Sequence, residues 1–480
     1  MYDFAIVGSG YGGFIPALRL TEQGFSVIVL EKGKEFADAD FKQSYSPAYF
    51  RKLYDCWYTS DYAAFFTTAR ILGGGSVLNA GASIRTPPEA FDIRKNGKRL
   101  WPQSITRAAL EPYYDLVQKE LRIRQISWNE VSKAGGKFAA ILSAAGLTCE
   151  RASFNFESCV QCGYCQAGCR FGRKITGVST YIEKSRRLGA QYMTGATVLR
   201  IAKRRDRFEV FYRKGWCEKV VRAARVILAA GTLGNVQILH NSRGLLPALS
   251  DRVGERFNTS GALSFLLELP DPDPEYFCYM GQTNPGIYNY DFWDSHRVVL
   301  HATTVPLAVL GAIPLRRPGE PPVLMSGTKF KQRVDELFPH KVVGGAVHGV
   351  LNYTGTVRVA RGGVKIEYEW APELKTYVSA VYGLLSRICQ RAGVGMLLTG
   401  DQRPFDMSTT LVLGTCSMAD SIEQGVVDPE GNVFNCPGLY ITDGSVIPAS
   451  LGVNPYFTIA ANAERLSAAI IASCRRPASV

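Results

Sequence analysis

Apolar residues near the start of the chain fall into short runs separated by polar and glycine-rich stretches. Residues 2–7 form a short apolar run that is typical of a strand, and residues 26–30 form a second one. Residues 14–20, between them, have the pattern of a helix, which Gly24 ends. This order of strand, turn, helix and strand predicts a nucleotide-binding unit with buried strands.

The turn after the first strand carries the most informative motif of the chain. Gly8, Gly10 and Gly13 form a G-x-G-x-x-G sequence between the predicted strand and the predicted helix. The first glycine permits the tight turn, the second lets a pyrophosphate approach the backbone, and the third lets helix pack on strand. Glu31 ends the second strand, close to the ~20-residue spacing expected for an acid that binds a ribose hydroxyl pair. An acid there repels a ribose 2′-phosphate, which disfavours NADP.

Elements of the same type occur far along the chain. A second glycine-rich stretch lies at residues 69–79, and residues 220–230 predict a buried strand followed by a helix at 233–239. Residues 439–445 again predict a strand and a turn, and a long helix is expected to begin near Thr458. The predicted nucleotide-binding elements therefore come from both ends of the sequence.

The region between these elements has a different pattern. Residues 260–408 contain alternating or apolar β-like runs and proline-rich turns, which predict an antiparallel sheet on the substrate side. We therefore expect an α/β protein in which a Rossmann-like domain carries an inserted antiparallel-sheet domain of α+β type. The predicted Rossmann-like domain comprises residues 1–259, which include the Cys-rich segment 159–169, and residues 409–480.

Composition narrows the class of protein. The 480 residues carry a net charge of +13, and 46% of them are hydrophobic, which allows a sizeable core. The charge predicts a solvated basic surface, with an anionic substrate, an acidic redox partner or an anionic membrane face as alternatives. We find no nucleic-acid-binding motif and no apolar stretch of ~18 residues. We therefore expect a cytoplasmic protein with no nucleic-acid partner and no transmembrane segment.

Four of the 12 cysteines lie close together in the sequence. Cys159, Cys162, Cys165 and Cys169 follow a C-x2-C-x2-C-x3-C pattern, which is the spacing of a ferredoxin-type iron–sulfur run. Arg170 follows the last cysteine, where the ferredoxin pattern has a proline. Three alternatives remain open: a [4Fe–4S] or [3Fe–4S] cluster, a structural zinc ion held by four thiolates, and plain buried thiols.

Taken together, the motifs resemble those of the glucose–methanol–choline (GMC) FAD-dependent oxidoreductases, especially the cholesterol-oxidase-like branch. Residues 8–13 match the N-terminal FAD fingerprint of that family, and residues 70–79 resemble its second signature, beside the flavin. Residues 443–448 and 452–455 resemble its C-terminal signature. The resemblance implies an FAD-dependent enzyme that removes a hydride from a substrate C–H bond and transfers it to flavin N5.

The resemblance also implies which residues contact FAD. Those expected to hold the ADP half, with Val198 at the adenine, are Gly8, Gly10, Gly13, Glu31 and Val198. Those expected near the flavin ring and ribityl chain are Gly74, Ser76, Asn79, Asp443 and Phe457. The family's covalent flavin links often use a histidine near the second glycine-rich element. The first histidine of this chain is His240, so we expect a noncovalent flavin.

The catalytic pair that the resemblance implies is incomplete. The family flanks flavin N5 with a histidine and an asparagine or second histidine, and Asn454 matches the second position. Leu411 stands where the histidine is expected, and leucine cannot accept a proton. We therefore consider His301 and His348, which lie in β-like runs of the predicted inserted sheet, as candidate bases. A tyrosine or glutamate of that sheet is an alternative.

Three functions are compatible with this sequence. The leading one is oxidation of a small or medium hydrophobic substrate, at an alcohol or an activated C–H bond, as a step of biosynthesis. Its electrons would pass to oxygen or to a redox carrier, the latter through an iron–sulfur cluster if one is present. Because Leu411 removes the usual base, a flavin-dependent isomerase or lyase with no net redox change is an alternative. A bare electron-transfer flavoprotein is disfavoured, because it needs no large inserted domain.

Overall fold

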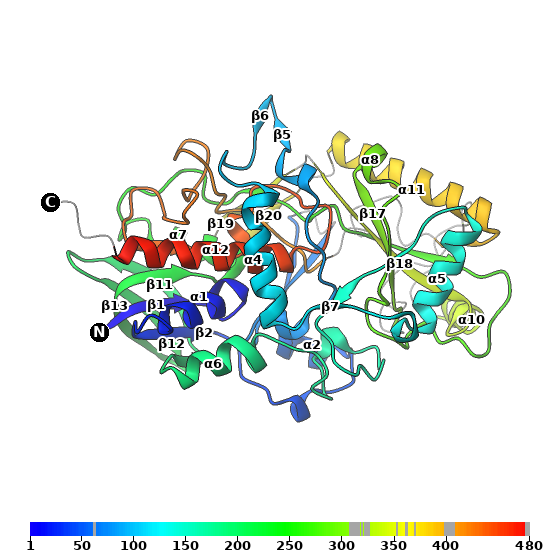
Figure 1. Cartoon of the computed structure of the whole chain (residues 1–480), viewed down its shortest axis with the longest axis horizontal. Helices are drawn as coiled ribbons and strands as arrows, with labels where there is room; N and C mark the ends of the chain where they lie inside the picture. The colour runs from blue at the N-terminus through cyan, green and yellow to red at the C-terminus, as the bar shows by residue number, and fades with distance from the viewer. Residues whose placement is uncertain are drawn as a thin grey trace.

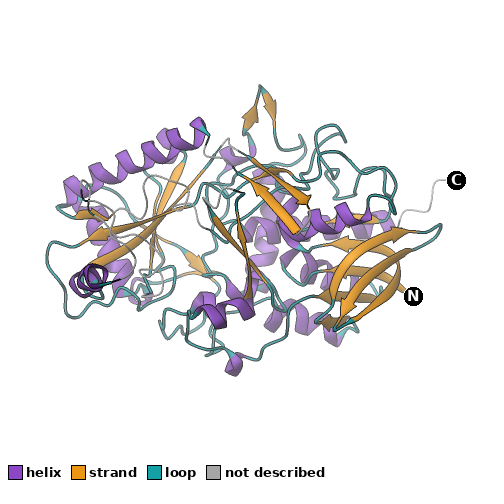
Figure 2. Cartoon of the chain, turned by 180° about the vertical axis from the view of Figure 1, so that it is seen from behind, coloured by secondary structure: helices purple, strands orange, loops and turns teal. Residues whose placement is uncertain are grey.

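A computed structural model of the protein describes residues 1–60, 64–306, 317, 320, 327–351, 354–360, 363–368, 371–397 and 409–475. The molecule is elongated and contains a large β-sheet in each half (Figures 1 and 2). The first strand (Tyr2–Val7) and the last described helix (Tyr456–Arg475) lie in the same half (Figure 1). That half is built from the two ends of the sequence, and the other half is built mainly from its middle.

A seven-stranded sheet forms the half that contains the first strand and the last described helix. The strand order is β10–β2–β1–β13–β12–β11, and β22 pairs with β13 in addition. The parallel strands are β1 (Tyr2–Val7), β2 (Val27–Glu31), β10 (Gln191–Thr194), β13 (Cys217–Leu228) and β22 (Leu439–Ile441). Strands β11 (Thr197–Lys203) and β12 (Phe208–Lys214) extend the sheet by antiparallel pairing next to β13. The parallel part confirms the predicted α/β fold class, and β1 lies between β2 and β13 within it.

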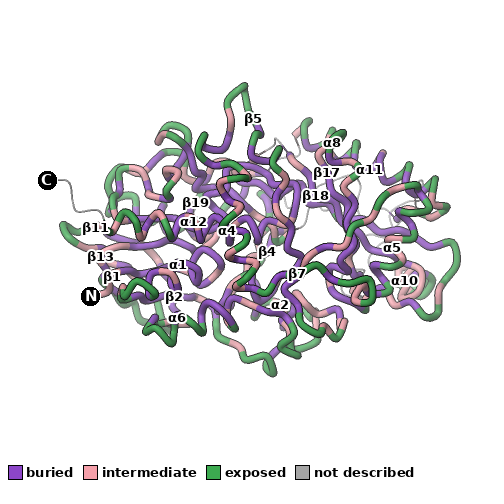
Figure 3. Tube along the Cα trace, in the orientation of Figure 1, coloured by how far each residue is buried: buried purple, intermediate pink, exposed green. Residues whose placement is uncertain are grey.

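Helices from distant parts of the sequence pack together on this sheet. Helix α1 (Tyr11–Thr21) lies against α12 (Tyr456–Arg475), which in turn lies against α4 (Arg107–Glu120) (Figure 1). The Arg19 guanidinium of α1 donates to the buried Glu464 carboxylate of α12 at 2.8 and 2.9 Å. Strands β1 and β2 are buried over most of their length, and so is the C-terminal end of β13 (Figure 3). The first and last parts of the chain therefore share one core.

A six-stranded antiparallel sheet forms the other half. In strand order it comprises β21 (Gly395–Leu397), β15 (Leu263–Glu268), β18 (Val342–Gly349), β17 (Val298–Thr303), β16 (Ile287–Asn289) and β8 (Glu150–Arg151). Helix α5 (Lys133–Ala144) packs against β16, β17 and β18, and it also contacts α11 (Pro372–Ala392). An antiparallel sheet thus occurs in the middle of the chain, as predicted, but strand β8 and helix α5 come from earlier residues.

A smaller antiparallel sheet lies between the two large ones. It consists of β14 (Glu255–Phe257), β19 (Gly355–Ala360) and β20 (Gly363–Glu367), and α7 (Gly231–Ser242) packs against β19. Its strands β19 and β20 therefore do not join the six-stranded sheet. The domain boundaries 1–259, 260–408 and 409–480 remain predictions, and residues 398–408 at the second boundary lie outside the described residues.

Short elements connect these sheets. They are α2 (Pro47–Leu53), β3 (Tyr54–Tyr58), β4 (Phe65–Ala69), α3 (Gly75–Leu78), β5 (Arg94–Lys95), β6 (Lys98–Arg99), β7 (Arg124–Gln125), β9 (Ser153–Phe154), α6 (Glu183–Arg187), α8 (Trp293–His296) and α10 (Thr328–Leu337). In the described part of the chain, none of the helices combines the length and apolar character that a membrane crossing requires.

Two adjacent glycines of α5 allow a direct test of its packing. A Cβ atom on Gly135 would come within 2.7 Å of the Val131 side chain and 2.8 Å of the Pro285 carbonyl oxygen, whereas one on exposed Gly136 would meet nothing within 4 Å. We expect Gly135→Ala to lower the free energy of unfolding by about 1–3 kcal/mol through overpacking. Gly136→Ala is expected to raise it by about 0.5–1 kcal/mol, because alanine favours the helix. Urea denaturation of the two variants measures both, and equal effects would contradict this packing.

Candidate active site

The glycine-rich turn leaves an open space at the start of α1. Gly10 caps the helix, and no side chain accepts from the N–H groups at this end. A Cβ atom on Gly10 would meet nothing within 4 Å, whereas one on Gly13 would overlap the Gly8 carbonyl oxygen. Gly8 itself has a φ of +94°, which favours glycine. The first turn of α1 therefore offers free N–H groups and room for an anion at the positive end of its dipole.

Glu31 lies at the end of β2, beside this turn. Its carboxylate is buried and accepts from the Ser9 N–H at 3.0 Å, the Ser9 hydroxyl at 2.7 Å and the Gly33 N–H at 2.6 Å. Burial raises the pKa of Glu31, and these three hydrogen bonds oppose that shift. The Ala196 N–H donates to the Glu31 carbonyl oxygen, which places Val198 of β11 just beyond this corner. The Glu31 carboxylate and the apolar Val198 side chain thus lie near the carboxyl end of β2.

The second glycine-rich element touches the first. Gly74 has a φ of +52°, and a Cβ atom there would lie 2.8 Å from the Gly10 Cα atom. The buried Ser76 hydroxyl donates to the Gly73 carbonyl oxygen and accepts from the Gly177 N–H, so it stabilises this turn internally. These contacts hold the 73–79 turn against the start of α1.

Asn79 ends the same turn and faces an aromatic pair. Its side-chain amide donates to the Tyr11 hydroxyl at 2.8 Å. The Tyr11 ring stacks on the Tyr456 ring with centroids 5.2 Å apart. The Asn79 carbonyl oxygen in turn accepts from the buried Lys174 ammonium group at 2.8 Å. Asn79 is therefore held from two sides, by α1 and by the Cys-rich segment.

Asp443 brings the C-terminal part of the chain to the same place. A Cβ atom on Gly12 would lie 2.6 Å from the Asp443 Cα atom, so the two backbones are in close contact. The buried Asp443 carboxylate accepts from the Gly231 N–H at 2.7 Å and from the Asn235 amide at 2.9 Å. Burial raises the pKa of Asp443, although its hydrogen bonds lower it in part. Elements from three distant parts of the sequence thus meet around the start of α1.

Asn454, which precedes α12, is connected to the six-stranded sheet. Its side-chain carbonyl oxygen accepts from the Tyr288 hydroxyl of β16 at 2.8 Å. The Asn284 amide donates to the same hydroxyl at 2.7 Å and lies 3.1 Å from His301 Nδ1. The Tyr288 and His301 rings stack with centroids 5.0 Å apart. Burial raises the pKa of Tyr288 well above its usual value, so its hydroxyl stays protonated and donates to Asn454.

The structure brings the two candidate bases together in this network. The His301 and His348 rings, on neighbouring strands β17 and β18, have centroids 4.8 Å apart and are buried. His301 Nδ1 lies 3.0 Å from the Ala302 carbonyl oxygen, and the Val453 backbone hydrogen bonds to His348. In the described part of the chain, His301 Nε2 and His348 Nδ1 have no hydrogen-bond partner. Each ring therefore presents one bare nitrogen in a buried setting.

Burial keeps both imidazoles neutral. It lowers the pKa of His301 to about 4, and it lowers the pKa of His348 well below the usual value, with a further contribution from the neighbouring His301. A neutral imidazole nitrogen that carries no proton can accept one from a hydroxyl group. At neutral pH the network around Asn454 thus contains two available proton acceptors.

These pKa shifts predict a loss of stability in acid. Unfolded histidine takes up a proton near pH 6.5, whereas folded His301 does so only near pH 4. The unfolded state therefore binds more protons between these values, and stability falls as the pH falls from 6.5 to 4. We expect His301 to account for about 3 kcal/mol of this loss, measured by urea denaturation across the range. His301→Gln should flatten the profile, and a profile equal to that of the wild type would contradict the shift.

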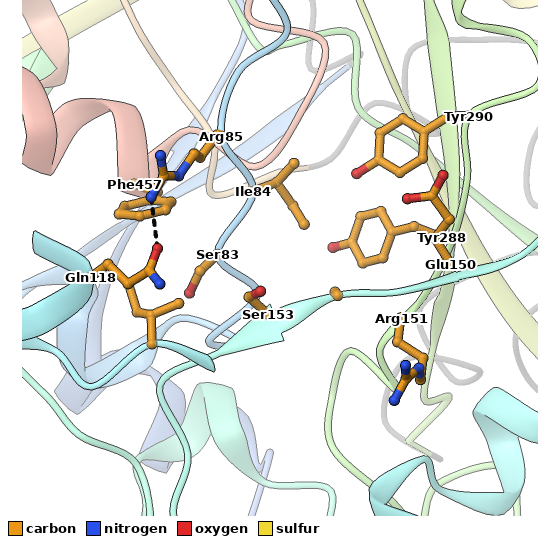
Figure 4. A pocket seen from close by; sticks show the side chains of 12 residues that line it. Ser83, Ile84, Arg85, Gln118, Glu150, Arg151, Ser153, Tyr288, Tyr290 and Phe457 are labelled. Carbon is orange, nitrogen blue, oxygen red and sulfur yellow. Dashed lines mark hydrogen bonds between the residues drawn. The ribbon is translucent and has the colours of Figure 1, made fainter. Parts of the chain in front are cut away.

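A cavity of about 310 Å³ adjoins this network at Tyr288 (Figure 4). Buried residues Ser83, Phe457 and Tyr288 form its inner part, and exposed Glu150 lies at its edge. Its lining comprises Ser83, Ile84, Arg85, Gln118, Ile123, Glu150, Arg151, Ala152, Ser153, Tyr288, Tyr290 and Phe457. Phe457 packs edge-on against the buried Tyr114 ring, with centroids 4.9 Å apart. Of the residues expected to contact FAD, Phe457 alone lines this cavity.

Sequence reasoning did not identify Tyr288 or Asn284. The only available signal was the presence of polar aromatic residues in the predicted inserted sheet. The departure at Leu411 is also clear in the structure, where this residue is half-buried and its N–H donates to the Thr409 hydroxyl. The histidine expected by resemblance at this position is thus absent, and other histidines lie beside Asn454.

The four clustered cysteines surround a small cavity of about 20 Å³. All 12 cysteines are free. Backbone N–H groups donate to Cys159 Sγ at 3.4 Å and to Cys169 Sγ at 3.2 Å. Burial raises the pKa of Cys159 to about 12 and also raises that of Cys162, so both side chains are thiols in the metal-free protein.

The described residues give no support for a metal site at these thiols. Among the described residues, no group of three or more His, Cys, Asp or Glu is arranged so that it could hold a metal ion. The predicted iron–sulfur cluster and the zinc alternative are therefore unsupported. The segment instead braces the site, because Tyr54 donates to the Gln166 carbonyl oxygen and Lys174 bridges the carbonyl oxygens of Cys165 and Asn79.

The fold and the comparisons define a class of protein. The arrangement around α1, next to a separate antiparallel sheet, is that of an FAD-dependent oxidoreductase. The GMC oxidoreductase family models match residues 13–259 and 402–463, which together make up more than half of the chain. The chain therefore belongs to the GMC oxidoreductase family, as the motifs predicted.

Several characterised proteins are similar over nearly the whole chain. A cholesterol oxidase of Mycobacterium tuberculosis is 27% identical over 97% of this chain and 90% of its own length. The paromamine 6'-oxidase of Streptomyces fradiae is 24% identical over 98% of this chain and 91% of its own. The crystal structure of pyridoxine 4-oxidase from Mesorbium loti superimposes with a TM-score of 0.73 at 17% identity, covering 98% of this chain and 99% of that one. FAD-dependent oxidation is the chemistry that these similarities support.

Proposed function

We propose that this protein oxidises an alcohol by transfer of a hydride from its carbon to flavin N5. The observation that carries this proposal is the set of hydrogen bonds that links Asn454, Tyr288 and Asn284, with the buried His301 ring stacked on Tyr288, beside a substrate-sized cavity. In support, the similar proteins named above include oxidases named for cholesterol and for paromamine. An alcohol must lose a proton from oxygen as the hydride leaves carbon, so such a site needs a proton acceptor.

The FAD site follows from the convergence around α1. The open space at Gly10 and the dipole of α1 would receive the pyrophosphate, Glu31 the ribose hydroxyls and Val198 the adenine. The residues proposed to hold the remainder are Gly8, Gly13, Gly74, Ser76, Asn79, Asp443 and Phe457. Of these, Ser76 would contribute by fixing the conformation of its turn, because its hydroxyl already bonds the Gly73 carbonyl oxygen and the Gly177 N–H. Residues 1–259 and 409–480 would thus form the FAD-binding domain and residues 260–408 most of the substrate domain.

The substrate side is assigned to Asn454, His301 and His348. Bound FAD would supply the hydride acceptor. Because the Tyr288 hydroxyl donates to the Asn454 carbonyl oxygen, the Asn454 amide N–H group is left to donate to the substrate oxygen. The bare nitrogens of His301 and His348 would accept the hydroxyl proton, in place of the histidine that Leu411 replaces. Burial excludes water from both nitrogens, which keeps them available to the substrate.

Tyr288 is expected to position Asn454. We expect Tyr288→Phe to lower the limiting rate of flavin reduction about tenfold, because the variant lacks one hydrogen bond that orients the amide. The dissociation constant for the alcohol should change less than the rate, and the flavin content should be unchanged. Tyr2→Phe removes a hydroxyl that bonds Gln191 on the far sheet and serves as the control. Equal rates for the two variants, measured by anaerobic stopped-flow mixing, would exclude this positioning role.

An isomerase or lyase with no net redox change is the second candidate. It is favoured by Leu411 alone, since loss of the family histidine removes the usual base of alcohol oxidation. The two candidates differ in their need for an electron acceptor. Turnover of an alcohol that stops when oxygen and artificial acceptors are removed supports oxidation. Continued turnover without any acceptor supports the non-redox reaction, and it would contradict the proposal above.

A further inference from the structure

The cavity beside Tyr288 has an unusually polar lining for a ligand site. Most ligand cavities are lined mainly by apolar and aromatic groups, with few polar ones. Here eight of the lining residues carry hydroxyl, amide or charged groups: Ser83, Arg85, Gln118, Glu150, Arg151, Ser153, Tyr288 and Tyr290. An apolar sterol or long-chain alcohol would remove water from those groups that have no hydrogen-bond partner among the described residues, Glu150, Ser153 and Tyr290, which is costly. The lining therefore favours a substrate that carries several hydroxyl groups.

The charged side chains that line the cavity differ in whether the protein itself supplies a partner for them. Arg85 is bonded to Glu111 and pairs with Asp115 at 2.6 Å, and it donates to Gln118 at 2.8 Å (Figure 4). The carboxylates of Glu111 and Asp115, both on α4, are thus already paired with Arg85. Its guanidinium is therefore neutralised from the side of α4.

The second arginine is also occupied. Arg151 donates to the Ile126 carbonyl oxygen at 2.9 Å, and its guanidinium lies over the Trp128 ring, 5.4 Å from the centroid. In Figure 4 the side chains of Glu150 and Arg151 point in opposite directions from β8, as neighbours on a strand do. Arg151 therefore does not balance the charge of Glu150.

Glu150 remains as an unpaired carboxylate. It lies on β8 directly opposite Tyr288 in the sheet. Burial raises the pKa of the nearby Tyr290, and the charge of Glu150 adds to that shift. In the described residues, no ion pair involves Glu150, in contrast to Arg85. A carboxylate at the edge of a polar cavity attracts a cationic group, and an ammonium group is the simplest that an alcohol substrate can carry.

We propose that this cavity binds a small polyhydroxylated molecule that carries a protonated amine, with Glu150 as the group that binds the amine. This inference rests on the proposed oxidation of an alcohol at Asn454 and specifies its substrate class. The hydroxyl groups of such a molecule match the hydroxyl groups of Ser153 and Tyr290 in the lining. The predicted preference for a hydrophobic substrate is replaced by a preference for a polar cation.

Binding of matched sugars to the FAD-loaded protein tests this proposal. The probes are glucosamine, its uncharged analogue N-acetylglucosamine, and dodecanol, with binding followed by perturbation of the flavin spectrum and by anaerobic bleaching. We expect glucosamine to bind about tenfold more tightly than N-acetylglucosamine. Glu150→Gln should abolish this difference. Glu157→Gln, which changes an exposed carboxylate paired with Arg122 outside the cavity, should preserve it.

The outcomes separate this inference from the proposed function. Equal affinity for the two sugars, or a difference that survives in Glu150→Gln, would overturn the assignment of Glu150. If dodecanol binds and bleaches the flavin while neither sugar binds, the substrate class is wrong and alcohol oxidation stands. If glucosamine binds through Glu150 but no alcohol of either kind bleaches the flavin, the cation site stands and the oxidation is wrong.

Discussion

Replacement of Gly10 by valine is expected to give a folded protein that no longer retains FAD. The extended backbone of Gly10 (φ −74°) accommodates a side chain, and a Cβ atom there meets no protein atom within 4 Å. The new side chain would instead fill the space at the start of α1, where we place the pyrophosphate. We expect FAD content after purification to fall at least about tenfold, which corresponds to about 1.4 kcal/mol of binding free energy.

Matched measurements separate cofactor loss from misfolding. The thermal unfolding midpoint of Gly10→Val should equal that of the wild-type protein stripped of FAD. Gly136→Ala, on the exposed face of α5, should retain FAD at the wild-type level. Retention of FAD by Gly10→Val at wild-type stoichiometry would show that the cofactor does not approach this turn. If Gly10→Val instead unfolds at a lower temperature than the FAD-free wild-type protein, Gly10 is needed for the fold.

The second large effect is expected from removal of both candidate bases. Glutamine in place of His301 and His348 keeps a polar side chain but cannot accept a proton at the pH of the reaction. We expect the double variant to reduce its flavin about 10²–10⁴-fold more slowly than the wild type, the usual contribution of a general base. Each single variant should lose less, because one bare nitrogen remains.

The readouts for these variants are the flavin reduction rate and its pH profile. His340→Gln is the matched control, since His340 bonds the Tyr276 carbonyl oxygen outside the network. In the wild type the rate should hold steady from neutral pH down to about pH 5 and fall below it, as His301 with a pKa of about 4 becomes protonated. An unchanged rate in the double variant would show that neither histidine is the base.

The elements that form the proposed cofactor site were predictable from the sequence, because the first of them are adjacent along the chain. The strand–turn–helix pattern around Gly8, Gly10 and Gly13 fixes the turn, and the length of α1 places Glu31 at the next strand end. The resemblance then located Asp443 and Asn454 at the far end of the chain. Their meeting with the glycine-rich turn is seen in the close contact of Gly12 with Asp443.

The substrate side was not predictable to the same depth. His301 and His348 were identified as residues of the inserted sheet, but their contact depends on the register between β17 and β18, which pairs His348 with Val299. The sequence does not determine that register. Tyr288 and Asn454 are likewise connected across separate elements, and β8 joins the sheet from a segment outside the predicted substrate domain.

The cysteine pattern predicts more from the sequence than the structure supports. Its spacing alone favours a cluster, yet the thiols surround a cavity of only about 20 Å³ in a buried setting. Desolvation raises the pKa of Cys159 and of Cys162, and no metal-binding group forms among the described residues. Spacing defines which thiols can approach one another, but it does not define how their side chains are oriented.

Anaerobic mixing of the FAD-loaded protein with amino-sugar and aliphatic alcohols, followed at the visible band of the oxidised flavin, tests the account most directly. We predict that at least one alcohol bleaches the band stoichiometrically, that oxygen or an artificial acceptor restores it, and that the double histidine variant bleaches far more slowly. A flavin that dithionite reduces but that none of these alcohols bleaches would contradict the account.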